Sequence, residues 1–310
     1  MAAKRILLIA NPTSGQHLGK RRLSQAKEHL TSLGHVVTAL LTKSAGHATR
    51  LAKSNAPDFE IIAALGGDGT VNEVANGLMA VEPVKRPALA TLPVGTGNDV
   101  ALTYGLAHFE SAIDALSKGS TRTLDVIRVQ LMQDGKLVTR HALLFVAAGF
   151  AAEVTRKTGP HVKRIFGRRF SYSVGLFRAL GSFRAPEFTV RWDEGEKSGQ
   201  MFQVCAGNTE FAAGGVMRIS PGARPDDGLL NISLVDALGR LQIMRRFPDI
   251  LSGRYVEDER VDYFMGKRLE IDAVPTAELQ ADGDIIGTTP ATVELLPRTL
   301  KLVVQDKFQI

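Results

Sequence analysis

Two glycine-rich loops contain the residues whose types and spacing suit chemistry on a phosphate group. The first, Gly66-Gly67-Asp68-Gly69-Thr70, follows an apolar run that ends at Leu65 and precedes a helix-like stretch from Val71 to Met79. The second, Pro93-Val94-Gly95-Thr96-Gly97-Asn98-Asp99, has the same strand–loop–helix context. Glycines allow backbone N–H groups to approach an anion, and the positive end of a following helix dipole favours phosphate. Two such loops predict a site for a nucleotide polyphosphate.

Asp68 is the charged residue of the first loop. A carboxylate beside a triphosphate would be repelled unless a cation lay between them. Hard cations such as Mg²⁺ prefer carboxylate oxygens and often keep several waters. We therefore expect Asp68 to hold Mg²⁺, directly or through water; the alternative is that the loop is a purely structural turn.

Both loops belong to a regular alternation of strand-like and helix-like segments. From residue 5 to about residue 122, apolar runs such as Arg5–Ala10 and His35–Thr42 alternate with helical patterns such as Lys20–Leu33. The alternation predicts a mostly parallel sheet with helices on both faces. Ligands of such sheets bind at the carboxyl ends of the strands, where both loops fall. We predict an α/β nucleotide-binding domain over residues 1–122.

The rhythm changes after Thr123 to short strand-like pieces. Turn signals such as Asp134-Gly135 and Asp227-Gly228 separate several of them, which is typical of an antiparallel sandwich. We predict a β-rich sandwich domain over residues 123–310, whose last residues pack back on the first domain. The length of 310 residues is sufficient for two such cores.

Composition excludes several classes of protein. Hydrophobic residues make up 44% and charged residues 23% of the chain, which is typical of a globular protein. Cys205 is the single cysteine, which excludes an intramolecular disulfide and a cysteine-only zinc site, and its apolar surroundings predict a packed side chain. No stretch approaches the roughly 20 apolar residues that span a bilayer. The apolar run at Arg5–Ala10 meets Asn11-Pro12 instead of a cleavage site, so we interpret it as a strand and expect a cytoplasmic protein.

Two common nucleotide fingerprints fail in this sequence. The stretch from Gly15 to Lys20 has three residues between its glycines where a P-loop has four, and Arg21 stands where a P-loop has a magnesium-binding Ser or Thr. Gly95-Thr96-Gly97 lacks the third glycine of a dinucleotide fingerprint, because Val100 occupies that position. Neither a P-loop enzyme nor a standard Rossmann enzyme is supported.

The order of the motifs resembles the diacylglycerol kinase catalytic domain, and the chain as a whole resembles soluble bacterial lipid kinases of the YegS and DgkB type. The resemblance rests on three motifs in the first half, Asn11-Pro12-Thr13-Ser14-Gly15, Gly66 to Glu73 and Leu92 to Asp99. It continues in later segments: Ala147-Ala148-Gly149-Phe150, Gly207-Asn208, Gly214 to Leu230 and Asp282-Gly283-Asp284. It implies a first domain like that of NAD kinases and phosphofructokinases, and a second domain that supplies lipid-binding and catalytic residues.

The resemblance also implies that the chain uses ATP. The residues that it assigns to the phosphates or the ribose are Thr42, Gly66, Gly67, Asp68, Gly69, Thr70, Val71, Asn72, Gly95 and Thr96. Asp68 would take part in catalysis through the metal ion, which is Mg²⁺, with Ca²⁺ as the other candidate.

Asp282 stands at the position of the general base in the family that the chain resembles. From spacing alone, Asp282-Gly283 predicts a hairpin turn. The resemblance favours a base that accepts the proton of a lipid hydroxyl as its oxygen attacks the γ-phosphate. Asp284 is also assigned to catalysis, although many relatives carry Glu at that position, which leaves its contribution open.

A second metal site is implied at Asp226-Asp227-Gly228-Leu229. Without the resemblance this stretch reads as a solvated turn. Similar proteins bind a structural magnesium there through one aspartate and two backbone carbonyls, which correspond to Asp227, Arg224 and Leu229, and hard oxygen ligands suit Mg²⁺. Asp125 is a further candidate for the same acidic network.

The net charge of +6 is concentrated in one segment. The segment Arg156–Arg184 mixes basic and aromatic residues and contains no acidic residue: its basic members are Arg156, Lys157, Lys163, Arg164, Arg168, Arg169, Arg178 and Arg184. We predict transient association of this segment with an anionic membrane surface, at the inner face of the membrane, because each basic residue near such a surface contributes about 1 kcal/mol. A solvated helix is the alternative, and nucleic acid is not expected because no recognised motif accompanies the patch.

These observations predict an ATP-dependent lipid kinase with a diacylglycerol- or phosphatidylglycerol-like substrate. The alternatives are a small-molecule kinase of the NAD kinase or phosphofructokinase type, which shares the Gly-Gly-Asp-Gly-Thr theme, and a non-catalytic protein that binds lipid or nucleotide. The sequence leaves open the lipid, the oligomeric state and the regulation.

Overall fold

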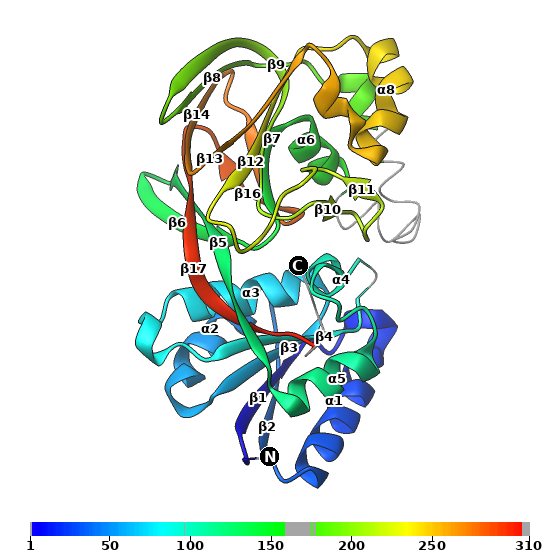
Figure 1. Cartoon of the computed structure of the whole chain (residues 1–310), viewed down its shortest axis with the longest axis vertical. Helices are drawn as coiled ribbons and strands as arrows, with labels where there is room; N and C mark the ends of the chain where they lie inside the picture. The colour runs from blue at the N-terminus through cyan, green and yellow to red at the C-terminus, as the bar shows by residue number, and fades with distance from the viewer. Residues whose placement is uncertain (1, 96, 159–174, 176–177, 306–310) are drawn as a thin grey trace. The chain divides into compact units, whose positions relative to one another are not determined.

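The computed structural model describes residues 2–95, 97–158, 175 and 178–305 (Figure 1). It divides into two compact units. Unit 1 comprises Met1–Val126, Ala213–Gly215 and Pro297–Ile310, and unit 2 comprises Ile127–Ala212 and Val216–Leu296. The chain therefore passes more than once from one unit to the other.

Unit 1 contains a parallel sheet in the order β4-β3-β1-β2. Its strands are β1 (Arg5–Ala10), β2 (Val36–Leu41), β3 (Ile61–Gly66) and β4 (Ala88–Pro93). All six residues of β3 and of β4 are buried, which agrees with the near-continuous apolar runs of parallel strands covered on both faces. The end of β17 (Ala291–Val303) adds a parallel contact to β4 through Leu302 and Leu89.

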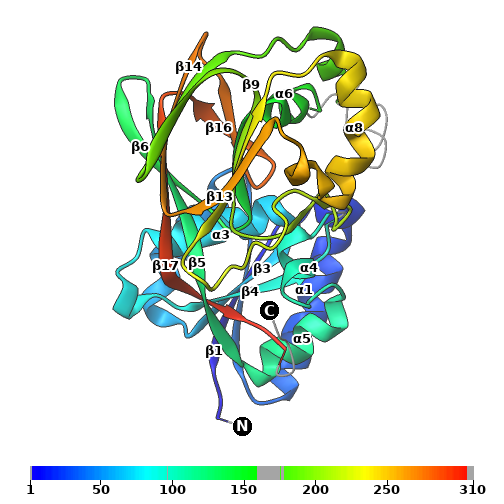
Figure 2. The same cartoon turned by 45° about the horizontal axis from the view of Figure 1, so that its top comes forward.

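Helices cover both faces of this sheet (Figures 1 and 2). One face packs on α1 and α5 in a cluster that includes Leu30, Ile113 and Leu65, while α2 and α3 pack on the other face. The helical elements of unit 1 are α1 (Ser14–Ser32), α2 (His47–Asn55), η1 (Ala56–Asp58), α3 (Asp68–Met79), η2 (Pro83–Lys85), α4 (Asp99–Thr103) and α5 (Phe109–Lys118). The predicted α/β fold of the first half is confirmed.

Unit 2 is built from antiparallel strands that form two connected layers. One layer runs β16-β15-β7-β9-β12-β13 and the other runs β9-β8-β14-β17-β5-β6. The strands are β5 (Thr121–Gln133), β6 (Lys136–Ala142), β7 (Phe145–Gly149), β8 (Glu187–Trp192), β9 (Gly195–Gly207), β12 (Leu230–Asp236), β13 (Val261–Gly266), β14 (Arg268–Val274), β15 (Glu278–Ala281), β16 (Asp284–Thr288) and β17. A short ribbon pairs β10 (Phe211–Ala212) with β11 (Met217–Arg218).

Strand β9 belongs to both layers because its two halves have different partners. Residues Gly195 to Gln200 pair with β8, whereas Gln203 to Gly207 pair with β7 and β12. The side chains between the layers form one apolar core, which includes Phe188, Val204 and Leu269. The predicted sandwich of the second half is confirmed.

Helical elements cover the outer face of the β7-β9-β12 layer. They are α6 (Phe150–Lys157), α8 (Arg240–Ser252) and η3 (Arg254–Glu257). Phe150 stacks on Phe202 with ring centroids 4.5 Å apart, and Phe183 meets Phe150 edge-on at 5.3 Å. In the described part of the chain, no helix is long and apolar enough to cross a membrane.

Candidate active site

The two glycine loops lie next to each other at the carboxyl ends of β3 and β4. Gly66 pairs in register with Pro93, and the Val94 N–H donates to the Gly66 carbonyl at 3.1 Å. A Cβ at Gly95 would lie 2.6 Å from the Cα of Gly67, so this approach of two backbones requires glycine. The sheet therefore brings the two loops into backbone contact.

Thr42 follows strand β2 at the same edge of the sheet. Its N–H donates to the Ala10 carbonyl at 2.9 Å, and the Asn11 N–H donates to the Leu65 carbonyl at 3.0 Å. The ends of β1, β2 and β3 are thus linked in a row by backbone hydrogen bonds. Unit 1 brings together Thr42, the stretch Gly66 to Asn72, and Gly95; Thr96 lies outside the described residues.

Helix α3 begins directly at the first glycine loop. Gly67 is the N-cap residue, has an extended conformation and provides no side-chain cap. The first helical turn starts at Asp68. A helix of 12 residues carries roughly half a positive charge at this end. The loop therefore presents an electropositive helix start, apart from the carboxylate of Asp68 itself.

The Asp68 carboxylate is half-buried at this edge, and its Oδ1 accepts the Val100 N–H at 3.1 Å. Loss of hydration raises the pKa of Asp68, and hydrogen bonds from the N–H groups of Val100, Asn98, Asp68 and Asp99 oppose that rise. Because burial is the larger effect, ionisation of this carboxylate is less favourable than that of an exposed one. A bound cation would relieve this cost, so the donor fits the predicted magnesium role.

Two acidic residues that were not predicted as site residues hold the loops around this edge. The Glu73 carboxylate accepts the N–H groups of Gly46 and Ala48, at 2.8 and 3.0 Å, and so fixes the start of α2 just after Thr42. Asp99 Oδ1 accepts the N–H groups of Gly214 and Gly215, at 2.6 and 3.2 Å. These partners are 25 to 116 residues away in the chain, so sequence spacing gave no signal.

Asp282 and Gly283 form the two-residue turn between β15 and β16, both with positive φ (49° and 87°). Positive φ at both central residues is the requirement of a type I′ hairpin, so the predicted turn is present. The Asp282 carboxylate is not simply solvated. Its Oδ2 accepts the Leu143 N–H at 2.7 Å, and its Oδ1 accepts the N–H groups of Leu144 and Phe145 at 2.9 and 3.1 Å.

Asp284 is the first residue of β16 and pairs with Ala281 across the turn. Its side chain is exposed, whereas that of Asp282 is half-buried. The two carboxylates therefore differ in exposure although they lie only two residues apart.

The turn at Asp227, predicted as a second metal site, is held by local polar contacts. Asp227 Oδ1 accepts the Leu229 N–H at 3.0 Å, while the Arg224 guanidinium lies 3.4 Å from Asp226 Oδ1. A hard cation here would use one carboxylate and the carbonyls of Arg224 and Leu229, which is the donor chemistry that Mg²⁺ takes. No group of three or more His, Cys, Asp or Glu side chains suits a metal among the residues that the structure describes.

Asp125 belongs to unit 1. It is fully buried, and its Oδ1 accepts the Arg298 N–H at 2.7 Å. This bond attaches the returning C-terminal part of the chain to unit 1.

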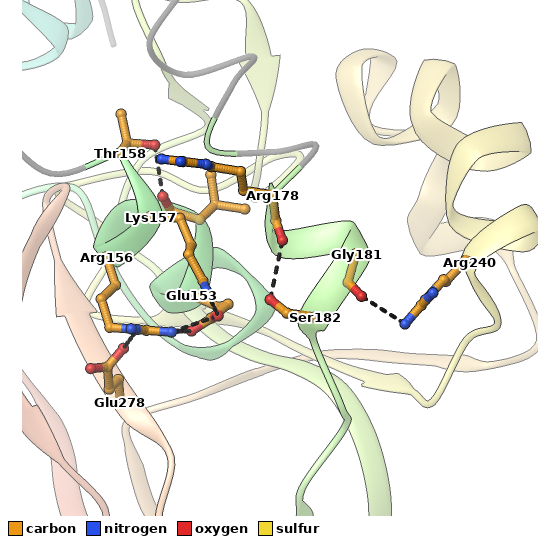
Figure 3. A network of polar contacts seen from close by, with 10 residues as sticks. Glu153, Arg156, Lys157, Thr158, Arg178, Gly181, Ser182, Arg240 and Glu278 are labelled. Atoms are coloured by element: carbon orange, nitrogen blue, oxygen red, sulfur yellow. Dashed lines mark hydrogen bonds and ion pairs between the residues drawn. The ribbon is translucent and has the colours of Figure 1, made fainter. Parts of the chain in front are cut away.

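The basic segment is only partly described, since Lys163, Arg164, Arg168 and Arg169 lie outside the described residues. Figure 3 shows that acidic side chains meet its first two members. Arg156 pairs with Glu153 at 2.7 Å and with Glu278 at 3.0 Å, and Lys157 lies 3.6 Å from Glu153. The acidic partners come from just before the segment and from a distant strand, which the local charge count did not show.

Comparison with family models divides the chain in two. Residues 5–129 match the diacylglycerol kinase catalytic domain, and residues 144–304 match the YegS C-terminal NAD kinase beta sandwich-like domain. The second match alone covers more than half of the chain.

Curated proteins match over nearly their whole length. A diacylglycerol kinase of Bacillus subtilis (strain 168) is 28% identical over 305 residues, which is 97% of this chain and 96% of that protein. A diacylglycerol kinase of Staphylococcus epidermidis (strain ATCC 35984) is 30% identical over 290 residues, covering 93% of this chain and 88% of that protein.

Solved structures show the same fold. The crystal structure of a diacylglycerol kinase from Bacillus anthracis str. Sterne superposes with a TM-score of 0.75 at 24% identity and covers 100% of both chains. A second structure from that organism gives a TM-score of 0.80 at 27% identity, with 99% of this chain and 97% of the other covered.

Proposed function

The chain belongs to the diacylglycerol kinase family and is a lipid kinase, and we propose that it transfers the γ-phosphate of ATP to the hydroxyl group of a lipid that resembles diacylglycerol or phosphatidylglycerol. Membership of the family implies that ATP is the phosphate donor. The observation that carries the proposal is the pair of glycine loops in backbone contact at neighbouring strand ends, with a helix starting at the first of them.

In this proposal, unit 1 holds the nucleotide. Residues Gly66 to Asn72 bind the phosphates through backbone N–H groups and the start of α3, and Gly95 and Thr96 complete the cradle. Thr42, at the end of the neighbouring strand β2, binds phosphate or ribose. Such a site contributes to catalysis mainly by positioning the phosphates and by neutralising their charge.

Asp68 is proposed as the residue that holds Mg²⁺, with Ca²⁺ as the other candidate ion. When bound, the ion would neutralise charge on the phosphate oxygens. The fit rests on the carboxylate itself, whose pKa burial raises, because an ionised group in this position gains more from a cation than an exposed one would. At the turn of Asp227, the same oxygen chemistry supports a structural Mg²⁺ held with the carbonyls of Arg224 and Leu229.

Asp282 is proposed as the general base that accepts the proton of the lipid hydroxyl. Three backbone N–H groups fix its carboxylate in one orientation, which is the preorganisation that a catalytic group requires. Little basicity is required of this group in a loose transition state, because the attacking oxygen has formed little of its new bond. Asp284 is proposed to assist from the exposed side of the turn.

The lipid is proposed to be taken from an anionic membrane surface. Within the described part of the segment Arg156–Arg184, Arg178 and Arg184 are exposed. Helix α8 adds exposed apolar side chains, Leu241 at 71% and Met244 at 57%, next to the exposed Arg245. Arg240 of the same helix donates to the Gly181 carbonyl at 2.7 Å, so α8 and the end of the segment are in contact (Figure 3). Basic and apolar side chains together are typical of surfaces that bind the interface of a membrane.

The test is transfer of label from Mg-[γ-³²P]ATP to a panel of acceptors. Diacylglycerol, phosphatidylglycerol, a sphingoid base and a ceramide would be presented in mixed micelles, and NAD and sugar phosphates in solution. Label on a glycerolipid supports the proposal and names the substrate. Label on NAD or a sugar phosphate, with none on lipid, would move the assignment to a small-molecule kinase.

A further inference from the structure

The corner between β6 and β7, residues Leu143 to Phe145, lies between Asp282 and a second polar residue, Asn208. Asn208 follows β9 directly and is fully buried. Its Nδ2 donates to the Leu143 carbonyl at 2.9 Å, and its backbone N–H donates to the Leu144 carbonyl at 2.7 Å. On the other side of the same corner, the N–H groups donate to Asp282.

Two peptide groups of this corner therefore carry a hydrogen bond at both ends. The peptide that joins Leu143 to Leu144 accepts from Asn208 Nδ2 at its carbonyl and donates from its N–H to Asp282 Oδ1 at 2.9 Å. The next peptide, which joins Leu144 to Phe145, accepts the Asn208 N–H at its carbonyl and donates to the same Oδ1 at 3.1 Å.

The second of these peptides is held by one more donor. The Thr209 N–H also reaches the Leu144 carbonyl, at 3.1 Å. Hydrogen bonds that follow one another through a peptide group polarise it and strengthen each other. The two N–H groups that donate to Asp282 Oδ1 thus belong to peptides whose carbonyls are bound by Asn208 and Thr209.

From this geometry we propose that Asn208 is a positioning residue for Asp282, acting through the peptides of Leu143 and Leu144. Its amide fixes the plane of the first peptide and so aims the Leu144 N–H at the carboxylate. Without the amide, the Leu143 carbonyl loses its buried donor, so the first peptide and its Leu144 N–H are held less strictly and the carboxylate is aimed less precisely. The assignment rests on the proposed function of Asp282, whereas the hydrogen-bonded link itself does not.

The test is a double-mutant cycle with Asn208→Ala, Asp282→Asn and the double variant in the full-length protein. For Asn208→Ala we expect kcat for lipid phosphorylation to fall roughly 10- to 100-fold, because a small misplacement of a catalytic group is costly. The KM for Mg-ATP should stay within about twofold, since the nucleotide residues belong to unit 1. In the Asp282→Asn background, the same substitution should cause no further loss of kcat, because a residue that acts through Asp282 has nothing left to position.

Asn231→Ala is the matched control. Asn231 is a buried asparagine of the same unit, and its Nδ2 donates to the Pro221 carbonyl at 3.3 Å and to Tyr263 Oη at 3.1 Å. Its removal should lower the unfolding midpoint but leave kcat per folded molecule within about twofold. Asn208→Leu is a second variant that removes the donor without leaving a cavity, and it should reproduce the kcat loss if the alanine variant does not fold.

Two results would overturn the proposal: wild-type kcat in both Asn208 variants, or an equal loss of kcat with and without Asp282. Urea unfolding of the wild type, Asn208→Ala, Asp282→Asn and the double variant distinguishes failure of this proposal from failure of the proposed function. The midpoint shift of the double variant should be smaller than the sum of the single shifts, even if no lipid is phosphorylated. Additive shifts would contradict the link.

Discussion

The substitution Asp282→Asn replaces one of two carboxylate oxygens that both accept backbone hydrogen bonds. The amide oxygen can occupy the place of Oδ1 and keep the Leu144 and Phe145 N–H groups as donors. The amide nitrogen then faces the Leu143 N–H, which donates to Oδ2 at 2.7 Å in the native turn, so two donors oppose each other. The reverse placement is worse, because the amide nitrogen would then face both the Leu144 and the Phe145 N–H groups.

The cost follows from the number and type of these bonds. A hydrogen bond to a charged group contributes about 1.5–3 kcal/mol and a neutral one about 0.5–1.5 kcal/mol. Loss of one charged bond and weakening of two others would sum to about 3.5–6 kcal/mol at a fully buried site. Partial exposure of Asp282 reduces the expected loss to about 2–4 kcal/mol in the free energy of unfolding. For a unit of this size, that corresponds to a decrease in Tm of roughly 5–15 °C.

The assay is urea unfolding followed by the fluorescence of Trp192. This residue is the single tryptophan of the chain, and its ring packs on Phe264 in unit 2 with centroids 4.7 Å apart, so the signal reports on the unit that contains Asp282. The control is Asp134→Asn. Asp134 and Gly135 form another Asp-Gly hairpin turn with positive φ, between β5 and β6, and the Asp134 side chain is exposed.

Asn-Gly suits such a turn as well as Asp-Gly does, so the backbone contribution cancels between the two variants. We expect Asp134→Asn to change the free energy of unfolding by less than about 0.5 kcal/mol. If Asp282→Asn is as stable as the wild type, or changes no more than the control, the three N–H bonds do not hold the carboxylate and the reasoning is wrong.

Three further predictions concern the phosphate site and the core. Burial raises the pKa of Asp68 above its ordinary 3.8, so between the unfolded and the native pKa the native state binds more protons than the unfolded state. The free energy of unfolding therefore falls as the pH rises through this interval. Asp68→Asn should remove this pH dependence and raise Tm at pH 7 without nucleotide, whereas identical Tm–pH curves for the variant and the wild type would contradict the prediction. Burial raises the pKa of the Cys205 thiol to about 12. Ellman's reagent at pH 8 should therefore label Cys205 in urea but not in the native protein. Rapid labelling of the native protein would refute the packing of the Cys205 side chain. Gly95→Ala places a methyl group 2.6 Å from Gly67 Cα and should raise the KM for Mg-ATP at least about tenfold. The control is Gly181→Ala, whose methyl group meets no atom within 4 Å and should leave this KM unchanged. Equal KM values for the two variants would contradict contact between the loops.

Local patterns were sufficient to predict the parallel sheet and its two loops. Apolar runs that end at glycine-rich turns fix both the strand and the edge where the loop lies, so the neighbouring ends of β3 and β4 follow from sequence. Asp282-Gly283 was predicted as a turn for the same reason: positive φ at two adjacent positions favours Asp and Gly.

Contacts between distant segments could not be predicted in this way. The partners of Asp282 lie 137 to 139 residues earlier in the chain, and nothing local marks Leu143 to Phe145 as donors. The neutralisation of Arg156 by Glu278 is another case, because the segment contains no acid of its own and the partner comes from β15. The first half of β9, Gly195 to Gln200, is also hard to predict as a strand, since its polar residues carry little β signal.

Phosphate transfer that depends on Asp282 is tested most directly by the initial rate of label transfer from Mg-[γ-³²P]ATP to a glycerolipid in mixed micelles. Wild type, Asp282→Asn and Asp134→Asn would be compared at a temperature where unfolding curves show each protein to be folded. We predict label on the lipid with wild type and Asp134→Asn, and a rate lower by roughly 10²- to 10⁴-fold with Asp282→Asn. Transfer by Asp282→Asn at the wild-type rate would contradict the role of Asp282 as the base.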